Sequence, residues 1–110
     1  AHLAELPLSD IQIPAVVKGE LLNGAYKSRF PETLSETERF LSYFSIVPFI
    51  DGMTYTYANI RSGLEKQGKP IGANDMLIAA TAFYHHATLV THNTAEFERI
   101  PGLLLEDWNI

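Results

Sequence analysis

The sequence has no cysteine and no long apolar run, and each absence excludes a class of protein. Without cysteine there is neither a disulfide framework nor a thiolate zinc site, which fits a reducing compartment. The apolar stretches fall far short of the roughly 20 residues that a membrane span needs. The first residues, Ala1–Leu6, also lack the basic and apolar regions of a signal peptide. We therefore expect a soluble, cytoplasmic protein.

Positive charge is also scarce. Eight Lys and Arg residues against 13 Asp and Glu residues give a formal net charge of −5 at pH 7. A protein that coats nucleic acid needs a basic face to neutralise phosphates, so the balance argues against that class. The charge balance is compatible with an enzyme that binds nucleic acid through a metal cation, because the cation reverses the electrostatic field of the acids around it.

What the sequence does contain is an alternation of helices with short apolar strands. At 110 residues the chain has the size of one domain, and we expect a single domain over residues 1–110. Residues 1–6 resemble the tail of a helix, and Trp108 a C-terminal anchor. Apolar periodicity, with Pro and Gly as boundaries, predicts strands at 11–13, 45–49, 88–91 and 103–105, and helices at about 15–27, 31–44, 51–67, 75–86 and 94–99. This order predicts a three-layer α/β/α fold with a mostly parallel sheet.

Glu20 is a candidate functional residue because of its place on a helix. In the helix after Pro14 it falls on the apolar stripe that contains Val16, Val17 and Leu21. Burying a lone carboxylate on such a stripe removes its hydration, which costs free energy unless a positively charged group pairs with it. Glu20 therefore either binds a cation, pairs with a buried arginine or caps a nearby helix.

Asp75 opens the most apolar helix of the chain. The segment 75–86 is apolar almost all round and is predicted to be buried between layers, with Asn74 as its cap. The small residues Ala79 and Ala82 leave little bulk beside Asp75. An aspartate in the first turn also stabilises the helix macrodipole, so a purely structural role is the alternative.

Asn93 and Glu96 directly follow the strand predicted at 88–91. Their spacing is also that of a capping box, in which Asn93 caps the short helix and Glu96 is its partner. In a parallel sheet, however, both residues, together with Glu20 and Asp75, come to the carboxyl edge, where open α/β folds bind ligands. Several oxygen donors on one edge favour a site for a hard cation.

Three blocks of these residues resemble a known family. Residues 13–28 place Glu20 shortly before Leu-x-x-Gly, residues 74–80 place Asp75 at the head of an Ile-Ala-Ala helix, and residues 89–103 supply the last block. In this order the blocks resemble PIN-domain ribonucleases of the VapC type, and together they cover essentially the whole chain.

The resemblance implies a PIN-like fold and a Mg²⁺- or Mn²⁺-dependent endoribonuclease. It further implies a toxin that cleaves tRNA or other structured RNA, often initiator tRNA, that forms a homodimer and is inhibited by a cognate VapB-like antitoxin. The implied catalytic residues are Glu20, Asp75 and Asn93, and the implied metal ligands are Glu20, Asp75, Asn93 and Glu96. Candidates to steer the RNA backbone are Lys18, Lys27, Arg29 and Lys69.

The chain departs from the family pattern at two places. PIN domains begin with a strand that ends in Asp-Thr-Asn or a similar run, whose aspartate binds the metal, and nothing in this sequence matches that strand. We therefore expect a PIN-like domain without its first, central strand. At the third block, Asn93 stands where an acid is usual, and Glu96 is expected to supply the charge.

A different class of function is a non-catalytic module that binds an antitoxin. Aromatic residues of the middle and end of the chain supply apolar surface for such binding, although most are expected in the core: Tyr43, Phe44, Phe49, Tyr55, Tyr57 and Tyr84. Serine chemistry is disfavoured because no Gly-x-Ser-x-Gly occurs. His85 and His86 are adjacent and point to different faces, which does not suit one zinc ion, and His92 is interpreted as structural.

Overall fold

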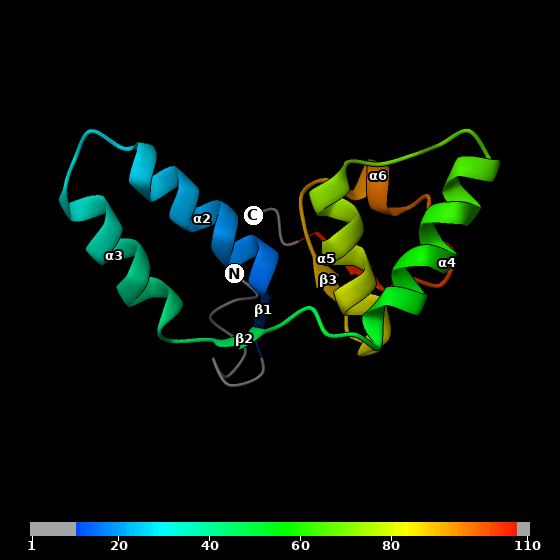
Figure 1. The fold of residues 1–110 in the computed structure, drawn as a ribbon, viewed down its shortest axis with the longest axis horizontal. Helices are drawn as coiled ribbons and strands as arrows, with labels where there is room; N and C mark the ends of the chain where they lie inside the picture. The colour runs from blue at the N-terminus through cyan, green and yellow to red at the C-terminus, as the bar shows by residue number, and fades with distance from the viewer. Residues whose placement is uncertain (1–10, 108–110) are drawn as a thin grey trace. The chain divides into compact units, whose positions relative to one another are not determined.

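The computed structural model describes residues 11–107 (Figure 1). The expected helix tail at residues 1–6 and the expected anchor Trp108 lie outside the described residues. The described chain forms two compact units, residues 11–48 and residues 49–107. The expectation that the whole chain is one domain stays a prediction.

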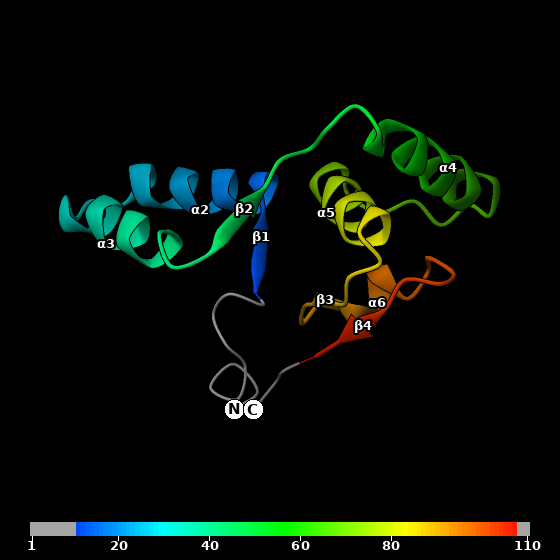
Figure 2. The same ribbon diagram turned by 90° about the horizontal axis from the view of Figure 1, so that it is seen from below.

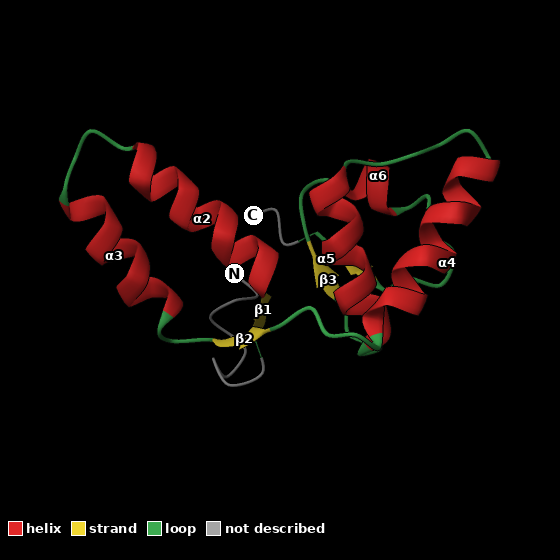
Figure 3. Ribbon diagram, viewed as in Figure 1, coloured by secondary structure: helices red, strands yellow, loops and turns green. Residues whose placement is uncertain are grey.

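The unit of residues 11–48 is a helical hairpin joined to a pair of short strands (Figure 3). Its elements in chain order are β1 (Gln12–Pro14), α2 (Ala15–Lys27), α3 (Glu32–Leu41) and β2 (Ser45–Val47). The two strands pair in parallel, with Ile13 opposite Ile46. The helices pack against each other, and their buried residues are Ala25 and Leu41. This unit therefore has little apolar interior of its own.

The unit of residues 49–107 surrounds a larger core. Its elements are α4 (Met53–Lys66), α5 (Ala73–Tyr84), β3 (Leu89–Val90), α6 (Thr94–Phe97) and β4 (Leu105–Glu106). Figure 2 shows α5 between α4 and the parallel pair β3–β4. The core brings together residues from α4, α5 and the segment of α6, namely Leu64, Met76, Ala79, Phe97 and Ile100. Thr81 is also buried, and its hydroxyl donates to the Leu77 carbonyl at 2.8 Å.

Helices α4 and α5 end in the same backbone motif but with different residues. After α4, Gly68 has φ +68°, and the Lys69 amide donates to the Leu64 carbonyl at 2.9 Å. After α5, His86 has φ +53°, and the Ala87 amide donates to the carbonyl of Ala82 at 2.9 Å. Both are Schellman motifs. Glycine adopts the left-handed conformation freely, whereas histidine adopts it against steric resistance.

Within residues 11–107 each predicted helix and strand has a counterpart, and both strand pairs are parallel, as an α/β fold requires. Within residues 11–107 the strands form two separate two-stranded sheets rather than one continuous sheet. The last strand, Leu105–Glu106, overlaps the predicted 103–105 at one residue, and the strand predicted at 88–91 is limited to Leu89–Val90. Burial was expected for that third strand, but Val90 is 41% exposed. No helix among the described residues is long and apolar enough to cross a membrane.

The prediction that Asn74 caps α5 is also wrong. The extended backbone of Gly72 occupies the N-cap position, and the Met76 amide donates to the Gly72 carbonyl at 2.9 Å. Asn74 therefore lies inside the first turn. Asp75 lies in that same turn, as predicted.

Candidate functional site

Three of the four predicted site residues lie together in the unit of residues 49–107. Asp75 comes from the first turn of α5, and Asn93 and Glu96 come from the short segment after β3. The Asn93 amide nitrogen Nδ2 donates to Glu96 Oε2 at 2.8 Å, and the Asp75 carboxyl is also hydrogen-bonded to Glu96. We call Asp75, Asn93 and Glu96 the acidic cluster.

The electrostatics of the acidic cluster centre on Glu96. Its hydrogen bonds with Asp75 and then with Asn93 lower the pKa of Glu96, and the nearby charge of Arg99 acts in the same direction. A hydrogen bond between two carboxyl groups requires a proton on one of them. The Asp75 carboxyl and the Asn93 amide both favour the ionised form of Glu96. A cation placed between the two groups would replace that shared proton.

Local backbone contacts hold the two halves of the acidic cluster in place. The Asn93 amide N–H donates to Thr91 Oγ1 at 3.0 Å, which fixes the turn between β3 and α6. Arg99 follows α6, and its Nη1 donates to the carbonyl of Pro70 at 2.9 Å. Pro70 belongs to the loop that leads into α5. Arg99 therefore ties the segment that carries Glu96 to the segment that carries Asp75.

The purely structural roles considered for Asn93 and Asp75, a helix cap and a macrodipole partner, differ in how well they agree with the structure. Asn93 occupies the N-cap position of α6, but its side chain makes no capping hydrogen bond and contacts Glu96 instead. The capping box is therefore absent at this helix. Asp75 lies in the first turn of α5, where it also stabilises the helix macrodipole, so a structural and a functional role are compatible there.

Glu20 lies on α2, in the unit of residues 11–48, and its side chain is exposed. The expectation that it loses hydration on an apolar stripe is wrong. Helix α2 packs against α3, and Ala25 is its buried residue. Leu21, which is adjacent to Glu20, is 41% exposed. That Glu20 shares a cation with Asp75 stays a prediction.

The donor atoms of the acidic cluster suit a hard divalent cation. Mg²⁺ is usually bound through one or two carboxylates and keeps several waters. The cluster offers the two carboxyl groups of Asp75 and Glu96 and the amide oxygen of Asn93, whose NH₂ group is engaged with Glu96. Within residues 49–107 no three acidic or histidine side chains form a metal-binding group. The fit therefore rests on two carboxyl groups and one amide.

The other predicted residues are placed as follows. Lys18 and Lys27 lie on α2, Arg29 follows it with its guanidinium 5.0 Å from the centre of the Phe30 ring, and Lys69 precedes α5. His92 Nδ1 lies 2.7 Å from Oδ1 of Asp107, the residue after β4. The interpretation of His92 as structural stays a prediction.

The expectation that most of the named aromatic residues are in the core is wrong. Tyr55 and Tyr43 are 79% and 59% exposed, and Phe49 and Tyr84 are also exposed. Phe44 and Tyr57 are half-buried. The buried residues of both units are instead mainly aliphatic side chains and alanines, and Phe97 is the aromatic residue among them.

Two arginines whose side chains make hydrogen bonds in the unit of residues 49–107 were not predicted from the sequence. Arg99 has no sequence signal, because its partner Pro70 is 29 residues away. Arg61 does have one, since Tyr57, Arg61 and Glu65 follow each other at the i, i+4 spacing of one helix face.

Comparison with known proteins gives concordant matches. A family model of the PIN domain matches residues 1–103. "Ribonuclease VapC2" from Rickettsia felis is 44% identical over 100 residues, which cover 90% of this chain and 75% of that protein. "tRNA(fMet)-specific endonuclease VapC" from Shigella flexneri is 39% identical over 98 residues, covering 88% of this chain and 74% of that protein.

Among solved structures, the fold resembles VapBC2 from Rickettsia felis, crystallised with a DNA fragment from its promoter. The TM-score is 0.84 at 42% identity, over 90% of this chain and 75% of that one. This similarity confirms the predicted PIN-like α/β fold.

Proposed function

This chain belongs to the PIN-domain family, and on that premise we propose that it is an endoribonuclease of the VapC type, the toxin of a toxin–antitoxin pair. The observation that carries the proposal is the acidic cluster, in which Asp75 and Glu96 share one hydrogen bond on adjoining segments. It lies in a chain that is 44% identical to a protein named as a ribonuclease. Both lines of support point to the same chemistry, the hydrolysis of a phosphodiester.

We propose that Mg²⁺ or Mn²⁺ is the cofactor. Bound at such a site, the cation would lower the pKa of a water and stabilise negative charge on the phosphate during in-line attack. Asp75 and Glu96 would hold it through carboxylate oxygens, and Asn93 through its amide oxygen. The proton shared between Asp75 and Glu96 would leave when the cation binds. We propose Glu20 as a further ligand, on the strength of the motif alone.

The proposed substrate is a tRNA. Its support is the name of the Shigella flexneri relative, a tRNA(fMet)-specific endonuclease, which is 39% identical to this chain. The chain carries a net charge of −5, so its overall charge does not attract the RNA backbone. Binding would therefore depend on the bound cation and on a small number of placed cations, of which Lys18, Lys27, Arg29 and Lys69 are the candidates.

The proposed protein partner is an antitoxin. Solved relatives of the same fold were crystallised as VapBC complexes, one of them with promoter DNA. The unit of residues 11–48 supports a partner, because it exposes large apolar side chains on α2, on α3 and on the segments that follow each helix: Leu21, Tyr26, Phe30, Phe40 and Tyr43. The same surface is the observation that favours the second candidate function, a module that binds antitoxin without cleaving RNA.

Cleavage of initiator tRNA by the purified chain in the presence of Mg²⁺ tests the proposal. We expect Asp75→Asn and Glu96→Gln to reduce the rate by roughly 100-fold or more, because each removes a carboxylate that would hold the cation, and the cation would stabilise negative charge on the phosphate. Glu98→Gln is the matched control, since Glu98 is exposed and lies two residues from Glu96 outside the acidic cluster. Glu20→Gln tests the fourth ligand in the same assay.

Two outcomes would contradict the proposal. Cleavage that is equal in the Asp75→Asn variant and in the unaltered chain would show that the acidic cluster is not the active site. Tight binding of an antitoxin by a chain that cleaves no RNA at any concentration of Mg²⁺ or Mn²⁺ would favour the binding module.

A further inference from the structure

A cavity of about 150 Å³ lies beside the first turn of α5, between α4 and the loop that precedes α5. Its apolar wall is formed by Leu64, Ile71 and Met76, of which Leu64 and Met76 are almost completely buried. Its polar edge is formed by side chains of α4, namely Tyr57, Arg61 and Glu65. One side of the cavity is therefore apolar, and the other carries hydrogen-bonding groups.

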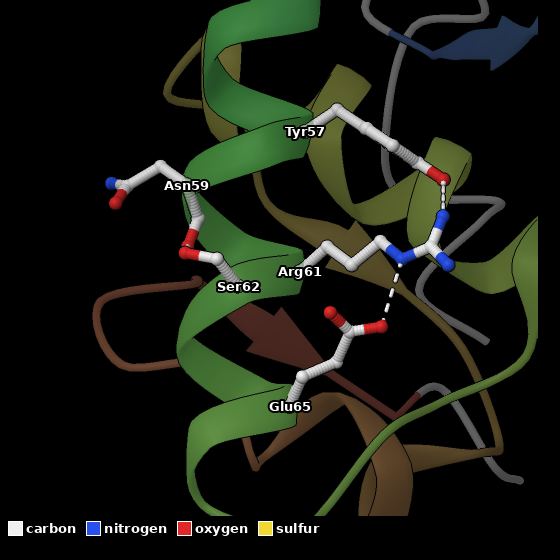
Figure 4. Close-up of polar contacts among 5 residues, drawn as sticks. All are labelled: Tyr57, Asn59, Arg61, Ser62 and Glu65. Atoms are coloured by element: carbon white, nitrogen blue, oxygen red, sulfur yellow. Dashed lines mark hydrogen bonds and ion pairs between the residues drawn. The ribbon is translucent and has the colours of Figure 1, made fainter.

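The side chains of the polar edge are linked by hydrogen bonds. Arg61 Nε donates to Glu65 Oε2 at 3.1 Å, and Arg61 Nη1 donates to the Tyr57 hydroxyl at 2.9 Å. Figure 4 shows these three side chains extending from the same side of α4, with Asn59 and Ser62 on the other side. A guanidinium has five N–H donors, so three remain to bind a ligand. Arg61 is therefore a preorganised donor at the mouth of the cavity.

The chemistry of the cavity favours a nucleobase over a phosphate. Its volume is well below the roughly 300–1,000 Å³ of pockets for larger ligands, which restricts the occupant to a small ring system. Glu65 repels a phosphate that approaches Arg61, whereas a base edge offers acceptors for the guanidinium and donors for the carboxylate. An exposed i, i+4 ion pair explains the contact between Arg61 and Glu65 but not the apolar cavity next to it.

The cavity adjoins the acidic cluster. Ala73 and Met76 line the cavity, and Asp75 between them belongs to the acidic cluster, so both sites share the first turn of α5. Arg99 holds Pro70, which also lines the cavity, against the segment that carries Glu96. A nucleotide with its phosphate at the acidic cluster thus has a binding place for a neighbouring base within the same unit.

We propose that this cavity binds one unpaired base of the RNA substrate, with Arg61 as the residue that reads its edge and Leu64, Ile71 and Met76 as the apolar wall. This subsite rests on the ribonuclease function proposed above. It makes Arg61 a determinant of substrate binding, whereas the acidic cluster carries the reaction.

The two methionines of the chain allow a direct test. Met76 lines the cavity and Met53 is buried at the start of α4, so methionine labelled with ¹³C at its methyl group gives one reporter and one internal control. The full chain is titrated in EDTA with guanosine, adenosine, cytidine and uridine monophosphates and with inorganic phosphate. We expect nucleotides, guanosine monophosphate most strongly, to shift the Met76 methyl signal saturably while the Met53 signal and the phosphate titration stay unchanged.

Variants of exposed α4 residues sharpen the test without endangering the fold. Arg61→Ala and Arg61→Lys are both expected to abolish the Met76 response, because lysine keeps the charge but loses the planar fork. Lys66→Ala, which removes an exposed cation from the same helix away from the cavity, should leave it intact. In RNA cleavage, Arg61→Ala should raise KM about tenfold and leave kcat within about twofold, as expected for a lost base contact.

The outcomes separate this proposal from the proposed function. RNA cleavage that depends on Asp75, together with a Met76 signal that no nucleotide shifts, would overturn the subsite alone. A Met76 signal that responds equally to inorganic phosphate, or to an antitoxin and to no nucleotide, would also overturn it. A nucleotide response lost in Arg61→Ala would support the subsite even in a chain that fails to cleave.

Discussion

The two units of this protein differ in where their large apolar side chains lie. Residues 49–107 bury Leu64, Met76 and Phe97 in a shared core. Residues 11–48 bury Ala25 and Leu41, and leave Tyr26 and other large side chains 41–72% exposed. The difference indicates that residues 49–107 supply most of the stability that the described chain has by itself. Residues 11–48 present exposed apolar side chains of the kind that mark interaction surfaces.

The largest expected effect compares two phenylalanines. Phe97→Ala removes a ring that is 2% exposed and should lower the free energy of unfolding by about 3–5 kcal/mol. Phe40→Ala removes a ring that is 50% exposed and lies 5.0 Å from Phe44, and should lower it by about 1 kcal/mol or less. Urea unfolding of both variants measures the difference. Equal losses would contradict the inference that residues 49–107 supply most of the stability.

A smaller effect is expected where Arg99 joins the two segments of the acidic cluster. Arg99→Met keeps the aliphatic stem but loses the hydrogen bond to the Pro70 carbonyl, which should lower the free energy of unfolding by about 1 kcal/mol. Amide hydrogen exchange in residues 69–72 should become faster at the same time. Arg39→Met, an exposed arginine on α3, is the control in the other unit. Unchanged exchange in residues 69–72 would show that Arg99 does not hold this loop.

The smallest effect concerns the end of α5. His86 has φ +53°, whereas the equivalent position after α4 is Gly68. His86→Gly should therefore raise the free energy of unfolding by about 0.5–1 kcal/mol, because glycine adopts this conformation without strain. His85→Gly at the preceding position, which has φ −88°, should lower it instead. A gain from both substitutions, seen by thermal unfolding, would contradict the conformational explanation.

Much of the acidic cluster could be predicted from the sequence because its geometry is local. Asp75 in the first turn of a helix and Asn93 three residues before Glu96 are positions that helical periodicity sets directly. The contact between Asp75 and Glu96 followed from the order of strands and helices in a parallel fold.

What the sequence did not predict depends on contacts between distant segments. A helical wheel shows that Glu20 shares a face with Val16 and Val17, but not whether anything packs on that face, and the side chain is exposed. The bond from Arg99 to Pro70 joins residues far apart in the chain and leaves no pattern. The cavity beside Arg61 needs the path of the loop that precedes α5, which propensities do not define.

Binding of Mn²⁺ to the acidic cluster tests the central claim most directly. The paramagnetic ion broadens amide NMR signals of nearby residues, and the readout needs no RNA. We predict that substoichiometric Mn²⁺ broadens the signals of Asp75, Asn93 and Glu96 first, and that Asp75→Asn removes this effect while Glu98→Gln preserves it. Broadening that spreads evenly over exposed acids, or that survives in Asp75→Asn, would contradict the account.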